Sequence, residues 1–141
     1  MATINKFEDI EAWKEARKLS NEVFKIIGEG AFSKDYKLRD QINGSSGSIM
    51  DNIAEGFERD GKREFIQFLS IAKASCGETK SQLYRSYDRG YIAKEKFEEL
   101  YNLSTKISKM ISGFMSYLKD SDYSGTKFAE PVFSYNNQPE T

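Results

Sequence analysis

The chain has 141 residues, of which 38% are hydrophobic and 30% charged, with a formal net charge of −1; these values fit one globular domain. It contains no histidine, which argues against Ser-His and Cys-His nucleophile systems and removes the commonest metal ligand. A single cysteine, Cys76, cannot form an internal disulfide, and no apolar run is long enough to span a membrane. We therefore expect a cytoplasmic protein with no metal, cofactor or membrane segment, and not an enzyme.

Four segments have the three- and four-residue spacing of apolar side chains that is typical of amphipathic helices. The first starts near Asp9, a good N-cap residue, and ends at Gly28. The others cover about 34–58, 62–89 and 94–119. Because short connections join segments of similar length, neighbouring helices must be antiparallel. The sequence thus predicts an all-α, up-down-up-down four-helix bundle over residues 7–119.

The second and third segments also predict which side chains face the core. These positions are Leu38, Ile42, Ile49, Ile53, Phe57, Phe65, Phe68, Leu69, Ala72, Cys76, Thr79 and Leu83.

Residues 120–141 lack a sustained apolar period, and one lysine stands against four acidic residues there. This composition predicts a flexible, disordered acidic tail. A second interpretation stays open because the apolar side chains within it could dock on a neighbouring surface. They are Phe128, Val132, Phe133 and Tyr135.

A polar stripe runs beside the apolar face of the second segment, and polar residues flank the core face of the third. It is either a solvated flank or a hydrogen-bonded seam between helices or subunits. Catalysis by Glu55 with Glu78 is a third interpretation, for which the sequence provides neither a metal ligand set nor a partner base. The stripe comprises Gln41, Ser48, Asn52, Glu55 and Arg59, and its counterpart in the third segment comprises Ser75, Glu78 and Gln82.

Five small residues, Gly-Ser-Ser-Gly-Ser at 44–48, lie in the middle of the second segment. No strand precedes them and no Gly-Lys-Ser/Thr follows, so they do not indicate a phosphate-binding loop. Small side chains instead favour close approach of a neighbouring helix.

Three lysines of the third segment, Lys62, Lys73 and Lys80, are spaced 11 and 7 residues apart and therefore share one side of a helix. They are candidate nucleic-acid-binding residues if they form a phosphate-facing stripe. The alternative is a solvated lysine face, which the lack of interleaved exposed aromatic residues favours.

Several stretches resemble the four helix bundle proteins encoded in 23S rRNA intervening sequences. The resemblance lies in Ser48-Ile49-x-x-Asn52-Ile53-Ala54-Glu55-Gly56-x-x-Arg59, in Glu64-Phe65-x-x-Phe68-Leu69-x-Ile71-Ala72-x-x-Ser75-x-x-Glu78, in Phe7-x-Asp9-Ile10-x-x-Trp13-x-x-Ala16 and in Gly90-Tyr91-Ile92. Accessory proteins of diversity-generating retroelements look similar.

The resemblance implies four-helix protomers that assemble as ring-shaped homopentamers. The retroelement accessory proteins bind nucleic acid and a reverse transcriptase through a basic surface. We therefore expect a non-enzymatic, self-assembling protein that scaffolds RNA, a ribonucleoprotein or a nucleic-acid-processing protein. A protein-only interaction module without nucleic-acid binding is the alternative.

Overall fold

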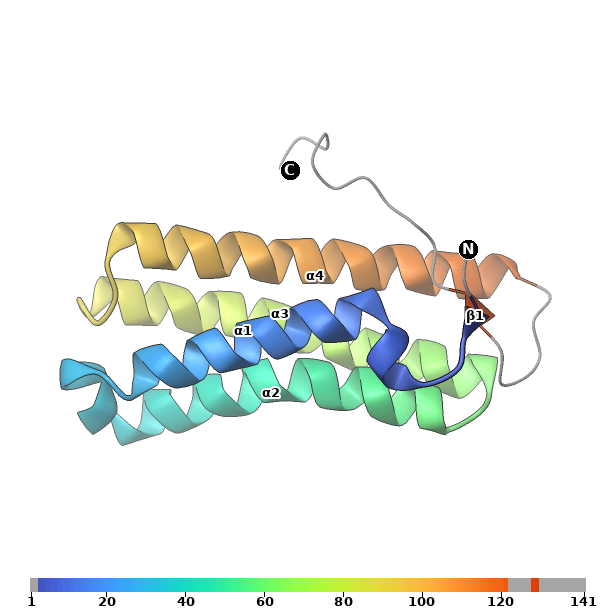
Figure 1. Ribbon diagram of the computed structural model, residues 1–141. Helices are drawn as coiled ribbons and strands as arrows, with labels where there is room; N and C mark the ends of the chain where they lie inside the picture. Colours follow the sequence, from blue (N-terminus) through green and yellow to red (C-terminus); the bar gives the residue numbers. More distant parts are fainter. Residues whose placement is uncertain (1–2, 122–127, 130–141) are drawn as a thin grey trace.

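The computed structural model describes residues 3–121, 128 and 129, and four long helices pack side by side in it (Figure 1). These are α1 (Glu11–Ile27), α2 (Tyr36–Glu58), α3 (Lys62–Asp88) and α4 (Lys94–Asp120). Successive helices are in contact, and α1 also contacts α4. The predicted all-α, up-down-up-down four-helix bundle is confirmed.

Both ends of the bundle are recognisable in Figure 1. The α1–α2 and α3–α4 connections lie at one end, whereas the α2–α3 connection and the N-terminal strand lie at the other. The α1–α2 connection contains the short 3-10 helix η2 (Gly30–Lys34). The surface at the end that carries the α1–α2 and α3–α4 connections is therefore formed by residues near 24–43 and 84–101.

The first helix begins later than predicted, and Asp9 is not its N-cap. Asp9 closes the 3-10 helix η1 (Phe7–Asp9), in which its amide donates to the Lys6 carbonyl at 3.0 Å. α1 follows at Glu11, with Ile10 as an N-cap that makes no side-chain hydrogen bond. Because the Ile10 side chain is fully buried, packing in the core decides this boundary rather than capping.

Asp35 caps the second helix and ties both connections together. Its Oδ1 accepts a hydrogen bond from the Leu38 amide at 3.2 Å, as an N-cap does. Its Oδ2 accepts from Arg89 Nη1 and from the Tyr91 hydroxyl, each at 2.8 Å. These hydrogen bonds lower the pKa of Asp35, the one from Tyr91 most strongly.

The predicted core positions of the second and third segments are buried, with one exception. Phe68 is half-buried, and the Arg59 guanidinium lies over its ring, 5.1 Å from the centroid. The buried predicted positions are Leu38, Ile42, Ile49, Ile53, Phe57, Phe65, Leu69, Ala72, Cys76, Thr79 and Leu83.

Close approach between α2 and α3 occurs at Gly56. A Cβ atom placed on Gly56 would lie 2.7 Å from Phe68 Cβ and 3.0 Å from Phe65 Cδ1. The small residues at 44–48 behave differently from the prediction: Ser45 and Ser46 are buried, but nothing lies within 4 Å of a Cβ atom placed on Gly44 or Gly47. These two glycines face outward, so the helix approach expected of them does not occur within one copy.

Part of the predicted tail forms a strand. β2 (Phe128–Ala129) pairs antiparallel with β1 (Thr3–Ile4), with Thr3 opposite Ala129 and Ile4 opposite Phe128. Ile4 is buried. The rest of the tail prediction, on residues 122–127 and 130–141, lies outside the described residues.

Among the helices of the described part of the chain, none combines the length and apolar character needed to cross a membrane.

Candidate functional site

The α2–α3 boundary contains a buried polar cluster of Ser45, Thr79 and Gln82. The Ser45 hydroxyl donates to Gln82 Oε1 at 2.5 Å and lies 2.9 Å from the Thr79 hydroxyl oxygen. All three side chains are buried. Such a satisfied polar cluster fixes the register of two helices, because sliding them would leave buried groups unpaired.

Several residues of the predicted polar stripe extend this cluster along the same boundary. Ser75, which is buried, donates to the Ser48 hydroxyl at 3.1 Å, and Asn52 Nδ2 donates to the Ser48 carbonyl and hydroxyl oxygens, each at 2.8 Å. Farther along, Arg85 Nη1 donates to Gln41 Oε1 at 3.0 Å. The structure thus brings Ser48, Asn52 and Ser75 together, and links Gln41 to α3.

The charged members of the stripe lie on the surface. Glu55 forms an ion pair at 3.1 Å with Arg59, the residue that follows α2, and both are exposed, as is Glu78. Because Ser75 contacts Ser48 and the helices are antiparallel, Glu78 lies level with about residue 45 of α2. Glu55 is ten residues farther along, which is about 15 Å. The structure does not bring the carboxylates considered for catalysis together.

Within the described residues, no group of three or more His, Cys, Asp and Glu side chains could hold a metal ion. Cys76 is buried in the core, and this burial raises the pKa of its thiol to about 12.

The three predicted lysines lie on the side of α3 that faces α4. Lys80 Nζ lies 4.5 Å from the Tyr101 ring centroid, and Lys62 Nζ donates to the Ser121 carbonyl at 2.5 Å. Lys73 lies between them and is exposed. Lys119 is 18 residues from Tyr101, or about five turns, and so shares its side of α4.

These residues, together with Lys109 on the outer side of α4, form what we call the lysine face: Lys62, Lys73, Lys80, Lys109 and Lys119. α4 has no Asp or Glu between Leu100 and Lys119, and its one acid near these lysines is exposed Asp120, at the end of the helix. The nearby acids of α3, Glu64 and Glu78, lie on its α2 side, next to Phe68 and Ser75. The lysine face is therefore locally positive although the whole chain is nearly neutral.

An aromatic cluster adjoins Lys80 at the end of the bundle and was not predicted as a unit. Its ring centroids are 4.9 Å apart for Tyr84–Phe97, 5.6 Å for Tyr84–Tyr101, 5.2 Å for Tyr87–Phe97 and 5.5 Å for Phe97–Tyr101. Tyr84 and Tyr87 are 49% and 40% exposed. The sequence signal was the pair of aromatic residues four apart, Phe97 and Tyr101, opposite tyrosines at the end of α3.

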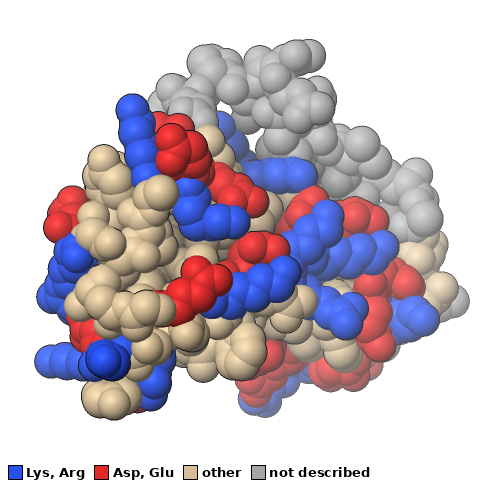
Figure 2. All heavy atoms as spheres, turned by 60° about the vertical axis from the view of Figure 1, so that its left-hand side comes forward, with Lys and Arg blue, Asp and Glu red and all other residues tan. Residues whose placement is uncertain are grey.

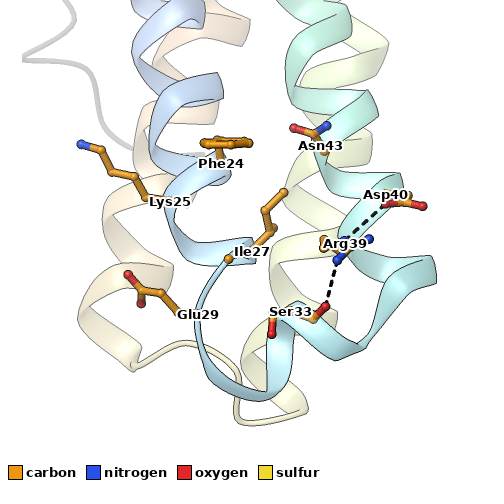
Figure 3. A pocket seen from close by; sticks show the side chains of 9 residues that line it. Phe24, Lys25, Ile27, Glu29, Ser33, Arg39, Asp40 and Asn43 are labelled. Carbon is orange, nitrogen blue, oxygen red and sulfur yellow. Dashed lines mark hydrogen bonds and ion pairs between the residues drawn. The ribbon is translucent and has the colours of Figure 1, made fainter.

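A hollow of about 470 Å³ lies at the same end, between α1 and α2 (Figure 3). Phe24, 69% exposed, borders it, and Arg39 closes one side through a 2.9 Å hydrogen bond from Nη1 to the Ser33 carbonyl. The Arg39 guanidinium also lies 4.8 Å from the centroid of exposed Tyr36. The hollow is lined by Phe24, Lys25, Ile27, Gly28, Glu29, Ser33, Arg39, Asp40 and Asn43.

Exposed aromatic side chains thus gather at the end that carries the α1–α2 and α3–α4 connections. Figure 2, which brings this end forward, shows uncharged surface bordered by positive and negative side chains. Phe24 and Tyr36 lie on one side, and Tyr84 and Tyr87 on the other.

Comparison with known proteins places the fold in a family. A protein of unknown function from the S23 ribosomal protein family of Bacteroides thetaiotaomicron, known from a crystal structure, is 26% identical and has a TM-score of 0.67. The match covers 77% of this chain and 98% of that one. A comparison with curated proteins found no match. The model of the 23S rRNA-intervening sequence proteins matches residues 8–113, which confirms the resemblance: the chain belongs to the 23S rRNA-intervening sequence protein family.

Proposed function

We propose that this chain is a non-enzymatic, self-assembling bundle of the cytoplasm that carries RNA or a ribonucleoprotein on its lysine face. The observation that carries the RNA part is the lysine face itself, whose five lysines run along α3 and α4 and reach the aromatic cluster of the bundle end at Lys80.

The chemistry of the lysine face fits single-stranded RNA better than a protein. Lysine ammonium groups bind phosphates and release counterions, whereas exposed aromatic rings stack on unpaired bases. Tyr84 and Tyr87, which are exposed, provide two such rings, and Tyr84 contacts Tyr101 beside Lys80. A duplex hides its base faces, so these rings favour an unpaired strand.

Binding of a short single-stranded RNA, followed by fluorescence anisotropy at several salt concentrations, tests this. Five phosphate contacts would give a slope of log K against log salt of about −3.5. Lys73→Glu with Lys80→Glu should remove binding at low salt. Lys34→Glu with Lys37→Glu makes the same charge change at exposed positions near the start of α2 and should leave binding nearly unchanged. Equal losses in both variants, or no binding by the unaltered protein, would end the RNA proposal.

The self-assembly part rests on the exposed aromatic side chains and on the family. Exposed large rings mark interaction sites where they gather, and Phe24 and Tyr36 both lie next to the hollow between α1 and α2. A homopentamer is the assembly that the family resemblance implies. Native mass spectrometry, with and without co-purified nucleic acid, measures the subunit number, and a mass near 16.2 kDa at micromolar concentration would refute self-assembly.

A protein-only interaction module is the second candidate, favoured by the hollow between α1 and α2. Exposed Phe24 and Tyr36 lie next to it, and aromatic rings around a hollow are typical of protein docking sites. Salt separates the candidates, because apolar protein contacts weaken little with salt whereas phosphate contacts weaken steeply.

A further inference from the structure

The outer side of α2 is acidic and flat. Residues 40–58 contain four acids and no lysine or arginine, and the arginines on either side pair with two of these acids, Arg39 with Asp40 at 3.4 Å and Arg59 with Glu55 at 3.1 Å. Helical spacing places them on one line that points away from the core, together with two glycines that have open space where a side chain would be. We call this line the α2 ridge: Asp40, Gly44, Gly47, Asp51, Glu55 and Glu58.

The outer side of α1 is basic. Its three acids pair with lysines of the same helix, Glu11 with Lys14 at 3.0 Å, Glu15 with Lys18 at 3.4 Å and Glu22 with Lys25 at 3.3 Å. Glu15 and Glu22 also pair with Lys106 and Lys96 of α4, at 2.9 Å and 3.7 Å, which leaves the outer side of α1 with an excess of positive charge. The residues that face outward are exposed and carry four positive charges. We call this line the α1 ridge: Lys14, Arg17, Lys18, Asn21 and Lys25.

We propose that the α2 ridge of one copy docks on the α1 ridge of a second copy. This inference rests on the self-assembly proposed above and names the surface that performs it. Figure 3 shows why the contact must join two copies: Lys25 and Asp40 lie on opposite flanks of the hollow and point away from each other.

The two ridges match in register as well as in sign. Figure 3 shows Lys25 on α1 and Asp40 on α2 at about the same height of the bundle. Eleven residues separate Lys25 from Lys14, and eleven separate Asp40 from Asp51. Since α1 and α2 run antiparallel with the same rise per residue, both pairs meet at once when copies are related by rotation about an axis along the bundle.

The glycines fall between these pairs. Gly44 and Gly47 are four and seven residues from Asp40, as Asn21 and Lys18 are from Lys25. The flat part of the α2 ridge thus faces the middle of the α1 ridge, where close helix approach needs small side chains. This explains two mid-helix glycines that have no packing role within one copy.

The positions of the ridges also predict a closed assembly. They occupy neighbouring corners of the bundle, about 90° apart around its axis. In a head-to-tail ring, the directions to the two neighbours differ by about 90° for four copies and about 108° for five. A small ring follows, and the lysine face, on the side opposite the α1–α2 side, points outward from it.

Charge exchange between the ridges tests the proposal by sedimentation of the full chain. Asp40→Lys with Asp51→Lys sets lysines against lysines and should weaken association at least about tenfold, giving a 16.2 kDa species. Lys14→Asp with Lys25→Asp should do the same. All four changes in one chain should restore the original mass. Glu78→Lys with Glu95→Lys, an equal charge change on exposed positions of α3 and α4, should keep that mass.

The outcomes separate the two proposals. A monomeric unaltered protein would refute self-assembly itself. If the unaltered protein assembles and the charge-reversed variants keep its mass, the ridge contact alone is overturned. The same holds if the variant with all four changes folds but stays monomeric. If the unaltered protein has the mass of a dimer, the ring is overturned. Circular dichroism checks folding, and Asp40→Asn with Asp51→Asn, which should weaken association without repulsion, replaces any reversal that unfolds.

Discussion

The contact of Gly56 with α3 makes a quantitative prediction for Gly56→Ala. An added methyl group would lie 2.7 Å from Phe68 Cβ, about 1 Å closer than carbon atoms prefer. Phe68 Cβ is attached to the α3 backbone, so rotation of the Phe68 ring cannot relieve the clash and the helices must separate. Overpacking of this kind destabilises by about 1–3 kcal/mol.

Alanine also favours helix over glycine by about 1 kcal/mol, which opposes this loss. The net effect of Gly56→Ala is then a destabilisation of about 0–2 kcal/mol. Gly77→Ala is the matched control, because Gly77 lies within α3 and nothing lies within 4 Å of its added methyl group. It should gain about 1 kcal/mol, so the two variants should differ by about 1–3 kcal/mol.

Urea unfolding at one fixed protein concentration measures this difference, with the mass of each variant checked because association shifts stability. In thermal unfolding, the variants should differ by about 4–12 °C, at about 4 °C per kcal/mol for a chain of this size. Equal stability of the two variants would show that α2 and α3 can adjust at Gly56, and would refute the argument from close approach.

Three further predictions concern single residues. Gly90 has a φ of +76° at the end of α3, so Gly90→Ala should destabilise by about 1 kcal/mol in urea unfolding, whereas equal stability would contradict a strained turn. Cys76 should react with a thiol reagent only on unfolding. Because its pKa of about 12 exceeds the unfolded value of 9.0, stability should fall as pH rises from 9 toward 12, an effect absent in Cys76→Ala. Asp35→Ala should lower the melting temperature at neutral pH, and since the pKa of Asp35 is lowered on folding, the difference from the unaltered protein should shrink as pH falls below 3.8.

Helical periodicity predicted the four helices well because each buries one apolar stripe, and the ends of α3 and α4 fell within one residue of the prediction. The start of α1 was wrong because a buried Ile10 outweighed the capping preference of Asp9. Local sequence signals describe a helix end only when no tertiary contact competes with them.

The polar residues were harder to predict because helical spacing gives a side of a helix but not a partner across it. Ser48 and Ser75 were both identified, yet their contact depends on the relative height of α2 and α3, which no single helix encodes. The Ser45 cluster was missed because its serine was interpreted through its small size rather than its hydroxyl group. The aromatic cluster was missed because its rings come from α3 and α4, and the sequence of one helix does not give its height relative to the other.

A ring with the lysine face outward would compensate for the low RNA affinity expected of a site with only five lysines. One copy offers few phosphate contacts, but a ring presents the same face several times to one RNA, and each further contact then forms within the complex at high effective concentration. A monomer produced by ridge reversal should therefore bind a long RNA much more weakly than the ring, while both bind a short RNA similarly. Equal affinity of monomer and ring for the long RNA would show that assembly and RNA binding are independent functions of this bundle.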